Sequence, residues 1–205
     1  RAFYVPVRSP DPSTHLDLKT ARPALMRLLG DEAVAKVGHN LKFDLVVLRA
    51  HGFEVRGVAG DSMVASYVDD ATRASHRLDA LAETLLDRRC VSITEIIGKG
   101  KDERPFSSAP LESAGPYAAE DADVTLQLSE VLEARVDAEG LGDLYRETEI
   151  PLVGVLADLE YEGIAVDAEE LDRQRIVLAD RIESLRTEIV DEAPHAFNPD
   201  SPKQL

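Results

Sequence analysis

The stretch Ala33-Val34-Ala35-Lys36-Val37-Gly38-His39-Asn40-Leu41-Lys42-Phe43-Asp44 carries the transition from a strand to a helix. Its first half, Ala33 to Gly38, has the composition of a short buried strand. Asn40 is a residue type that caps helix N-termini, and the apolar residues that follow it lead to a stop at Gly52. We therefore expect a strand that ends near residue 38 and a helix that begins after Asn40.

The same alternation of strand and helix recurs on both sides of this stretch. Phe3 to Val7 has strand composition, and a helix capped by Thr20 is expected to follow it. Downstream, Val55 to Val58 predicts another short strand, and Asp61 is placed to cap a helix that runs through Tyr67. Such an alternation is typical of an α/β layered domain.

Helices dominate the second half of the sequence. One is expected from Arg77 to Leu86, and Pro116 is placed to begin another that continues to Leu132. The segment between them contains Gly98-Lys99-Gly100-Lys101, which lacks the spacing of a nucleotide-binding P-loop. We expect this segment to be a flexible surface loop.

The character of the sequence changes after Gly140. A helix is expected from Ile150 to near Gly163, and Asp167 with Glu170 has the spacing of a capping box for a long helix. Along that helix apolar residues recur as in a helix that packs on a partner: Leu171, Leu178, Ile182, Leu185 and Ile189. We expect a second domain from residue 147. We also expect a chain cut at both ends, because it begins without Met and stops about one turn into a helix that Ser201-Pro202 would start.

The composition of the 205-residue chain, 44% hydrophobic and 30% charged, is that of an ordinary globular protein. No apolar run approaches the roughly 20 residues that cross a bilayer, so no membrane contact is expected. Cys90 is the only cysteine, which excludes a disulfide within the chain and is compatible with the cytoplasm. The net charge of −16 argues against a broad basic surface for nucleic acid but allows a local site.

Basic residues are nevertheless enriched in one part of the chain. They are Arg73, Arg77, Arg88, Arg89, Lys99, Lys101 and Arg104. This enrichment is compatible with a path for a nucleic-acid strand, and equally with a solvated surface of loop and helix.

Two pairs of polar side chains, each spaced by one helical turn, indicate a metal site. Asn40 with Asp44, and Tyr117 with Asp121, each lie on one face of a predicted helix. Divalent cations prefer oxygen ligands, and two such ions about 4 Å apart can stabilise the attacking and the leaving oxygen of a phosphodiester. Asp44 and Asp121 are the candidate ligands. Tyr117, a phenol of pKa about 10, is better suited to orient the attacking water than to act as a base, and Asn40 to hold substrate.

Ordinary structural roles explain the same residues. A lone Asp on an amphipathic helix is usually a solvated acid, and the run from Glu120 to Asp123 has the composition of an acidic helix face. Tyr117 is equally typical of a half-buried core residue with its hydroxyl at the surface, and Asn40 of a helix cap. The metal-site interpretation therefore depends on whether the two pairs meet in the fold.

Five segments occur in an order that is similar to a known family. They are GHNLKFD (38–44), GDSMVASYV (60–68), LDALAETLL (78–86), EIIGKGK (95–101) and YAAEDADVTLQL (117–128). Together they resemble the bacterial A-family DNA polymerases, the family of DNA polymerase I, over nearly the whole chain. Residues 1–146 resemble the 3′-5′ exonuclease domain, and residues 147–205, through FNPDSPKQL, resemble the start of the polymerase domain that leads into its thumb.

The resemblance implies a ribonuclease-H-like fold, a mixed sheet flanked by helices, and a two-metal exonuclease that uses Mg²⁺ or Mn²⁺ on single-stranded 3′ ends of DNA. Two family motifs correspond to Asn40 with Asp44 and to Tyr117 with Asp121. By the same resemblance, Asn40 and Phe43 contact the substrate. The family's first motif, Asp-x-Glu on the opening strand, is not in this sequence. We therefore expect the parent protein to proofread and polymerise, and this chain alone to show little or no activity.

Three alternatives stay open. The exonuclease fold can persist as a scaffold within a polymerase after loss of its acids, although the presence of both pairs weighs against this. An RNA-trimming exonuclease of the same superfamily is the second alternative, and the segment FNPDSPKQL weighs against it. The third is an unrelated acidic interaction protein, which a lack of Mn²⁺ binding near Asp44 and Asp121 would favour.

Overall fold

A pair of parallel strands lies in the first half of the chain. β1 (Lys36–Gly38) pairs with β2 (Val58–Asp61), with Lys36 opposite Val58 and Gly38 opposite Asp61. Parallel strands need a crossover connection, and α2 (Leu41–Ala50) supplies it. The predicted order of strand, helix and strand around Asn40 is confirmed, as is the α/β class. The described strands form a parallel pair rather than the mixed sheet that the resemblance implied.

Gly57 sets the start of β2. Its φ angle is 70°, and a Cβ atom at this position would lie 2.7 Å from the carbonyl oxygen of Glu32 and 2.8 Å from that of Val34. Only glycine fits both restrictions. The Gly57 carbonyl accepts a hydrogen bond from the backbone N–H of Lys36 (2.8 Å), so the strand follows this turn and begins at Val58, later than predicted.

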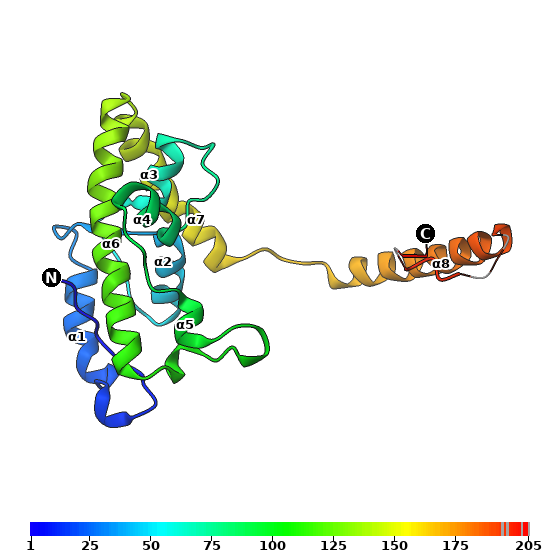
Figure 1. Ribbon diagram of the computed structural model, residues 1–205, viewed down its shortest axis with the longest axis horizontal. Coiled ribbons are helices and arrows are strands. Elements are labelled where there is room, and N and C mark those ends of the chain that lie inside the picture. The colour runs from blue at the N-terminus through cyan, green and yellow to red at the C-terminus, as the bar shows by residue number, and fades with distance from the viewer. Residues whose placement is uncertain (194, 196, 202, 205) are drawn as a thin grey trace. The chain divides into compact units, whose positions relative to one another are not determined.

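Figure 1 shows the computed structural model, which describes residues 1–193, 195, 197–201 and 203–204 and divides into two units, Arg1–Glu162 and Gly163–Leu205. Pro202, which was expected to begin a helix, lies outside the described residues. The remaining α-helices are α1 (Leu18–Leu29), α3 (Ser62–Asp69), α4 (Leu78–Leu86), α5 (Ile93–Ile97), α6 (Leu111–Ala138), α7 (Ile150–Glu162) and α8 (Ala168–Glu192). Shorter helical turns are η1 (Pro12–Thr14), η2 (Gly100–Asp102), η3 (Phe106–Ser108) and the π-helix η4 (Leu144–Glu149).

The core of the first unit is built around α6, which runs the length of that unit in Figure 1. Its side chains Val124, Leu128, Leu132 and Val136 recur every four residues, so they form one stripe, and all are fully buried. α3 and α4 pack against α6. The buried cluster consists of Ala65, Leu81, Ala82, Val124, Leu128, Leu132, Val136, Tyr145 and Ile150.

Three predicted elements differ from the structure. Thr20 does not cap the first helix but lies inside α1, which begins at Leu18 with Asp17 at the N-cap position. Phe3 to Val7 forms no strand; the described residues offer it no neighbouring strand, and Pro6 lacks an N–H for a ladder. The Pro6 carbonyl instead accepts a hydrogen bond from the backbone of Leu16 (2.9 Å). α6 begins at Leu111, five residues before the predicted start at Pro116, because the Pro110 carbonyl already accepts hydrogen bonds from the first turn.

α7 packs against α2 within the first unit. Arg49 donates to Asp158 (2.6 Å) and Glu162 (3.0 Å), and its guanidinium lies 4.0 Å from the centre of the Tyr161 ring. The predicted helix from Ile150 to near Gly163 is confirmed. The compact unit runs to Glu162, and the assignment of residues 147–205 to a separate domain stays a prediction.

α8 is the main element of the second unit. The Asp167 carboxylate accepts a hydrogen bond from the backbone N–H of Glu170 (2.9 Å), so the predicted cap is confirmed. The apolar residues predicted to pack on a partner helix are all between 38% and 60% exposed. Among the described helices, none is both long enough and apolar enough to cross a membrane.

Candidate functional site

An open cleft of about 860 Å³ lies at the end of β1. Its lining comes from the start of α2, the start of α4, the segment 90–93 and the first half of α6. Asn40, Asp44, Tyr117 and Asp121 all line it, so the structure brings both predicted pairs together. Phe43 is not among the lining residues, and its side chain is 63% exposed.

Asp61 fixes the start of α2 at this cleft. Its buried carboxylate accepts hydrogen bonds from the backbone N–H groups of Asn40 (3.1 Å) and Leu41 (2.6 Å). The same carboxylate accepts from Met63 (2.9 Å) and Val64 (3.2 Å) in the first turn of α3. The predicted cap of α3 is thus confirmed, and one carboxylate caps two helices whose N-terminal dipoles both favour its charge.

The side chain of Asn40 does not cap α2, contrary to the sequence prediction. Asp61 already accepts hydrogen bonds from the first amides of the helix, which removes the need for a local cap. Asn40 instead has left-handed backbone angles (φ 59°, ψ 45°), a conformation that Asn tolerates better than most residues. Its side-chain amide is therefore not committed to the helix end.

Tyr145 holds the backbone of Asp61 from the opposite direction. The Asp61 N–H donates to the Tyr145 hydroxyl oxygen (2.9 Å), and this hydroxyl lies 3.3 Å from the Asp61 carbonyl. Tyr145 is fully buried, and burial raises its pKa to about 12. The end of β2 is thus fixed by a neutral, buried phenol.

Tyr117 and Asp121 lie one turn apart on α6 and are both half-buried. Burial, followed by the charge of Asp121 and a hydrogen bond to it, raises the pKa of Tyr117 to about 12. The Tyr117 ring also lies 5.9 Å, centre to centre, from that of Phe106. A phenol with this pKa stays protonated at neutral pH, so it can position a water molecule but is a poor base.

The two candidate metal ligands in the cleft, Asp44 and Asp121, have raised pKa values. Loss of solvation is the largest cause for both, although Asp44 is the more exposed of the two. The charge of Asp61 raises the pKa of Asp44 further, and that of Glu120 raises the pKa of Asp121, which a hydrogen bond from Tyr117 partly offsets. Because the charged neighbours of Asp44 and Asp121 are also acids, a bound cation would reduce the repulsion between these carboxylates.

The donor set of the cleft fits part of a metal site. Asp44 and Asp121 offer carboxylate oxygens, which are the ligands that Mg²⁺ and Mn²⁺ prefer. Within the described ranges, no three or more His, Cys, Asp and Glu side chains are arranged to hold a metal ion. A complete shell therefore needs ligands beyond those that the described residues bring together.

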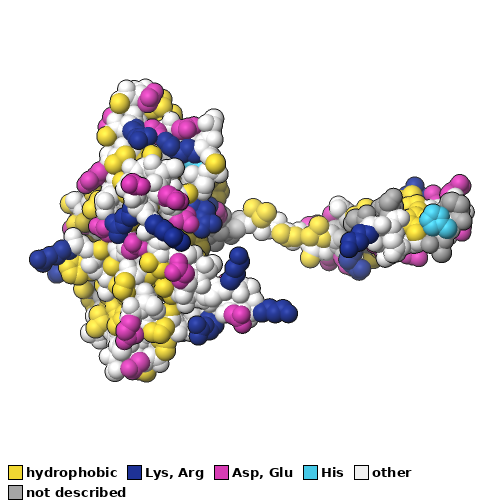
Figure 2. Space-filling view, viewed as in Figure 1, with side chains coloured by type: hydrophobic (Ala, Val, Ile, Leu, Met, Phe, Trp, Pro, Cys, Tyr) yellow, Lys and Arg dark blue, Asp and Glu magenta, His cyan; other side chains and the backbone are white. Residues whose placement is uncertain are grey.

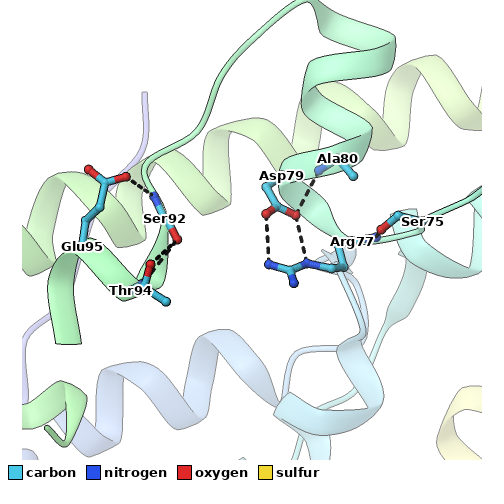
Figure 3. A network of polar contacts seen from close by, with 7 residues as sticks. All are labelled: Ser75, Arg77, Asp79, Ala80, Ser92, Thr94 and Glu95. Atoms are coloured by element: carbon cyan, nitrogen blue, oxygen red, sulfur yellow. Dashed lines mark hydrogen bonds and ion pairs between the residues drawn. The ribbon is translucent and has the colours of Figure 1, made fainter. Parts of the chain in front are cut away.

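The cleft has a second wall that the motif spacing does not predict. Arg77, Asp79, Cys90 and Ser92 line it. Figure 3 shows Arg77 beside Asp79 at the start of α4, and the Ser92 capping box at the start of α5. Only the capping box has a local sequence signal, because Ser92 is followed three residues later by Glu95.

The acidic face of α6 holds this wall in place. Arg88 donates to Asp123 (2.7 Å) and to Glu120 (3.3 Å). Glu120 also accepts a hydrogen bond from the backbone N–H of Val91 (2.8 Å). These two acids of the run between residues 120 and 123 therefore position the segment that contains Cys90 rather than serving only as a solvated helix face.

The basic residues between positions 73 and 104 lie at different places in the fold. Arg73 pairs with Asp69, and Arg77 lines the cleft. Lys99 and Lys101 are exposed on the loop after α5, where dark blue side chains gather in Figure 2. A single continuous basic path is therefore not evident among the described residues.

The α/β fold and the acidic cleft place the chain among ribonuclease-H-like exonucleases. The model of the family described as 3′-5′ exonuclease, from A-family DNA polymerases, matches residues 9–137. The chain belongs to this 3′-5′ exonuclease family. It is 42% identical over 190 residues to DNA polymerase I of Rhizobium leguminosarum, an alignment that covers 93% of this chain and 19% of that relative. The chain thus spans about a fifth of the relative's length.

Solved structures support the same fold. The POL domain of Pol1 from M. smegmatis, in complex with DNA primer-template and dNTP, superposes with a TM-score of 0.73 at 26% identity, covering 95% of this chain and 30% of that chain. NrnC of Brucella melitensis bound to pGG gives a TM-score of 0.56 at 26% identity, covering 71% of this chain and 69% of that one. A second NrnC structure, with bound Mg²⁺, gives 0.56 at 24% identity, covering 70% and 68%.

Proposed function

We propose that this cleft is the proofreading site of a bacterial DNA polymerase I. The parent protein would remove mismatched nucleotides from single-stranded 3′ ends of DNA by hydrolysis and would also synthesise DNA. The observation that carries the proposal is the meeting of both motif pairs in one cleft, on α2 and α6. DNA polymerase I relatives at up to 42% identity, and a solved relative in complex with DNA primer-template, support it.

Each residue has a distinct role in this proposal. Asp44 and Asp121 hold Mg²⁺ or Mn²⁺; Mg²⁺ is the ion bound in the NrnC structure and is the first to test. When bound, two such ions would supply Lewis-acid stabilisation of the phosphoryl oxygens. The Tyr117 hydroxyl orients the water that attacks phosphorus, and the bond to the 3′ oxygen breaks. Asn40 holds the strand by its uncommitted amide, and Phe43 offers an exposed ring on which a base can stack.

The chain alone is expected to hydrolyse DNA slowly or not at all. Asp44 and Asp121 are two carboxylates, whereas two divalent ions need about four. The described residues bring together no cluster of three potential ligands. Robust, chelator-sensitive exonuclease activity from the 205-residue chain would contradict this part of the proposal.

Cation binding tests the site itself. Titration calorimetry with Mn²⁺ should detect weak binding to the chain, and Asp44→Asn or Asp121→Asn should lower the affinity at least about tenfold, because each removes a charged ligand. Asp180→Asn, at an exposed position on α8, is the matched control and should bind as the unsubstituted chain does. Equal affinities for all four proteins would refute the metal-site assignment.

A scaffold without catalysis is the second candidate, favoured by the lack of a three-ligand cluster among the described residues. It predicts no measurable Mn²⁺ binding at the cleft. It also predicts that a longer version of the protein, carrying the polymerase region, lacks exonuclease activity. Activity in the longer protein that Asp121→Asn abolishes would exclude the scaffold.

A further inference from the structure

The lining of the cleft carries more negative than positive charge. Asp44, Asp79 and Asp121 are its acidic members, and Arg77 is its one Lys or Arg among the described lining residues. A nucleic-acid strand carries one negative charge per nucleotide and enters against this field. Cations at Asp44 and Asp121 would compensate the charges of those two residues. A phosphate of the strand could then be bound at the wall of the cleft that contains Arg77.

The guanidinium of Arg77 is already oriented. Its Nε donates to one carboxylate oxygen of Asp79 (3.1 Å) and its Nη2 to the other (3.0 Å). Asp79 is itself held by the backbone N–H of Ala80 (3.0 Å) in the first turn of α4. Figure 3 shows the third nitrogen of Arg77 turned away from Asp79. Within the described residues this nitrogen, Nη1, has no hydrogen-bond partner, so its donors are available to a ligand.

We propose that Arg77 binds a phosphate of the single strand in the cleft and that Asp79 is the positioning residue for it. The inference rests on the proposed function, since it assigns a contact to the same substrate. An arginine held in a bidentate pair loses little side-chain entropy when a phosphate binds its free edge.

A second ion pair in the chain provides a matched control. Arg56 and Glu54 are also two residues apart and form an exposed ion pair, with side chains 56% and 68% exposed against 74% and 48% for Arg77 and Asp79. Neither residue lines the cleft. If Arg77 were only one more surface ion pair, removing either arginine would have the same effect.

The test is binding of a fluorescein-labelled oligothymidylate to the 205-residue chain, followed by fluorescence anisotropy with Mn²⁺ present to compensate Asp44 and Asp121; the chain alone is expected to cleave the oligonucleotide slowly or not at all. Arg77→Gln should weaken binding about tenfold, the value of one charged hydrogen-bond contact. It should also lower the slope of log K against log salt by about 0.7, the contribution of one phosphate contact on a single strand. Arg77→Lys should keep the salt slope of the unsubstituted chain but only part of its affinity. Lys keeps the positive charge but lacks the planar, paired N–H donors of the guanidinium. Arg56→Gln should match the unsubstituted chain.

The outcomes separate two kinds of failure. If the unsubstituted chain does not bind the oligonucleotide, the proposed function fails and this inference fails with it. If it binds, and Arg77→Gln has the affinity and salt slope of Arg56→Gln, only the assignment of Arg77 is overturned. Thermal unfolding of each variant is measured in parallel. Should Arg77→Gln lose its fold, the affinity of Arg77→Lys decides: an affinity equal to that of the unsubstituted chain would overturn the phosphate contact, because the planar guanidinium would then contribute nothing to binding.

Discussion

α6 and α8 are the two longest of the described helices, at 28 and 25 residues, but they use their apolar side chains differently. α6 buries a stripe that includes Leu128 and Leu132 against α3 and α4. α8 has a comparable apolar repeat, yet none of its residues is buried in the described structure. An apolar repeat predicts a helix, but its side chains become part of a hydrophobic core only where another helix or strand packs against them. The candidate site lies on the helix that has such partners.

The largest predicted loss of stability comes from removing the buried helix cap at Asp61, compared with removing the exposed cap of α8 at Asp167. Asp61→Ala leaves the amides of two helix ends without their acceptor and should cost about 4 kcal/mol of the free energy of unfolding. Asp167→Ala removes the exposed cap of α8 and should cost about 1 kcal/mol. Urea unfolding followed by circular dichroism measures both. Equal costs would show that burial of the cap adds nothing.

Truncation of the two apolar stripes should have the next largest effect. Leu128→Ala, at a fully buried position of α6, should cost about 3 kcal/mol because it leaves a cavity. Leu178→Ala, at a position 60% exposed on α8, should change stability by less than about 0.5 kcal/mol. The same urea experiment applies. A large loss from Leu178→Ala in the isolated chain would mean that α8 has a partner in solution.

The smallest predicted difference between α6 and α8 is in how stability depends on pH, and it comes from Asp121 on α6. The pKa of Asp121 is raised in the folded chain, mainly by loss of solvation, from an ordinary value of 3.8. The folded state therefore binds this proton more tightly than the unfolded state. Its stabilising contribution is fully present below pH 3.8 and is lost as pH rises through the raised pKa.

Asp121→Asn, which cannot ionise, should thus gain stability relative to the unsubstituted chain as pH rises from 4 to 7 in the absence of divalent ions. The gain should be smaller than the effects of the two preceding predictions, since Asp121 is half-buried. Asp180→Asn on α8 is the control. Parallel stability curves for Asp121→Asn and the unsubstituted chain over this pH range would be evidence against the raised pKa.

The sequence predicted the elements whose signals are local. The cap at Asp61, the strand before Gly38 and the helices α7 and α8 depend on residues within a few positions of each other. The cap of α2 could not be found in this way, because its carboxylate lies 20 residues downstream and reaches the helix only through the pairing of β1 with β2. The strand expected at Phe3 to Val7 was wrong for a related reason: a strand needs a neighbour, and composition does not supply one.

The residues of the candidate site also fall into those that the sequence could predict and those that only the fold reveals. Spacing by one turn predicted that Asp44 and Asp121 would each share a helix face with a second polar residue, and packing places both pairs in one cleft. The opposite wall, with Arg77 and Cys90, is brought there by the packing of α4 and α5 on α6. Nothing in the spacing of those residues indicates a cleft, so they could be found only in the fold.

The left-handed backbone at Asn40 has a consequence for any mutational study of the cleft. Replacing Asn40 with Ala deletes the amide and at the same time removes the short polar group that lets Asn tolerate this conformation, so the β-carbon strain of roughly 1–2 kcal/mol is no longer offset. A loss of function in that variant would mix two causes. Gly removes the amide while relaxing the backbone, and Asp retains a polar group with similar tolerance of this geometry. Position 40 thus requires a chemical series instead of an alanine scan.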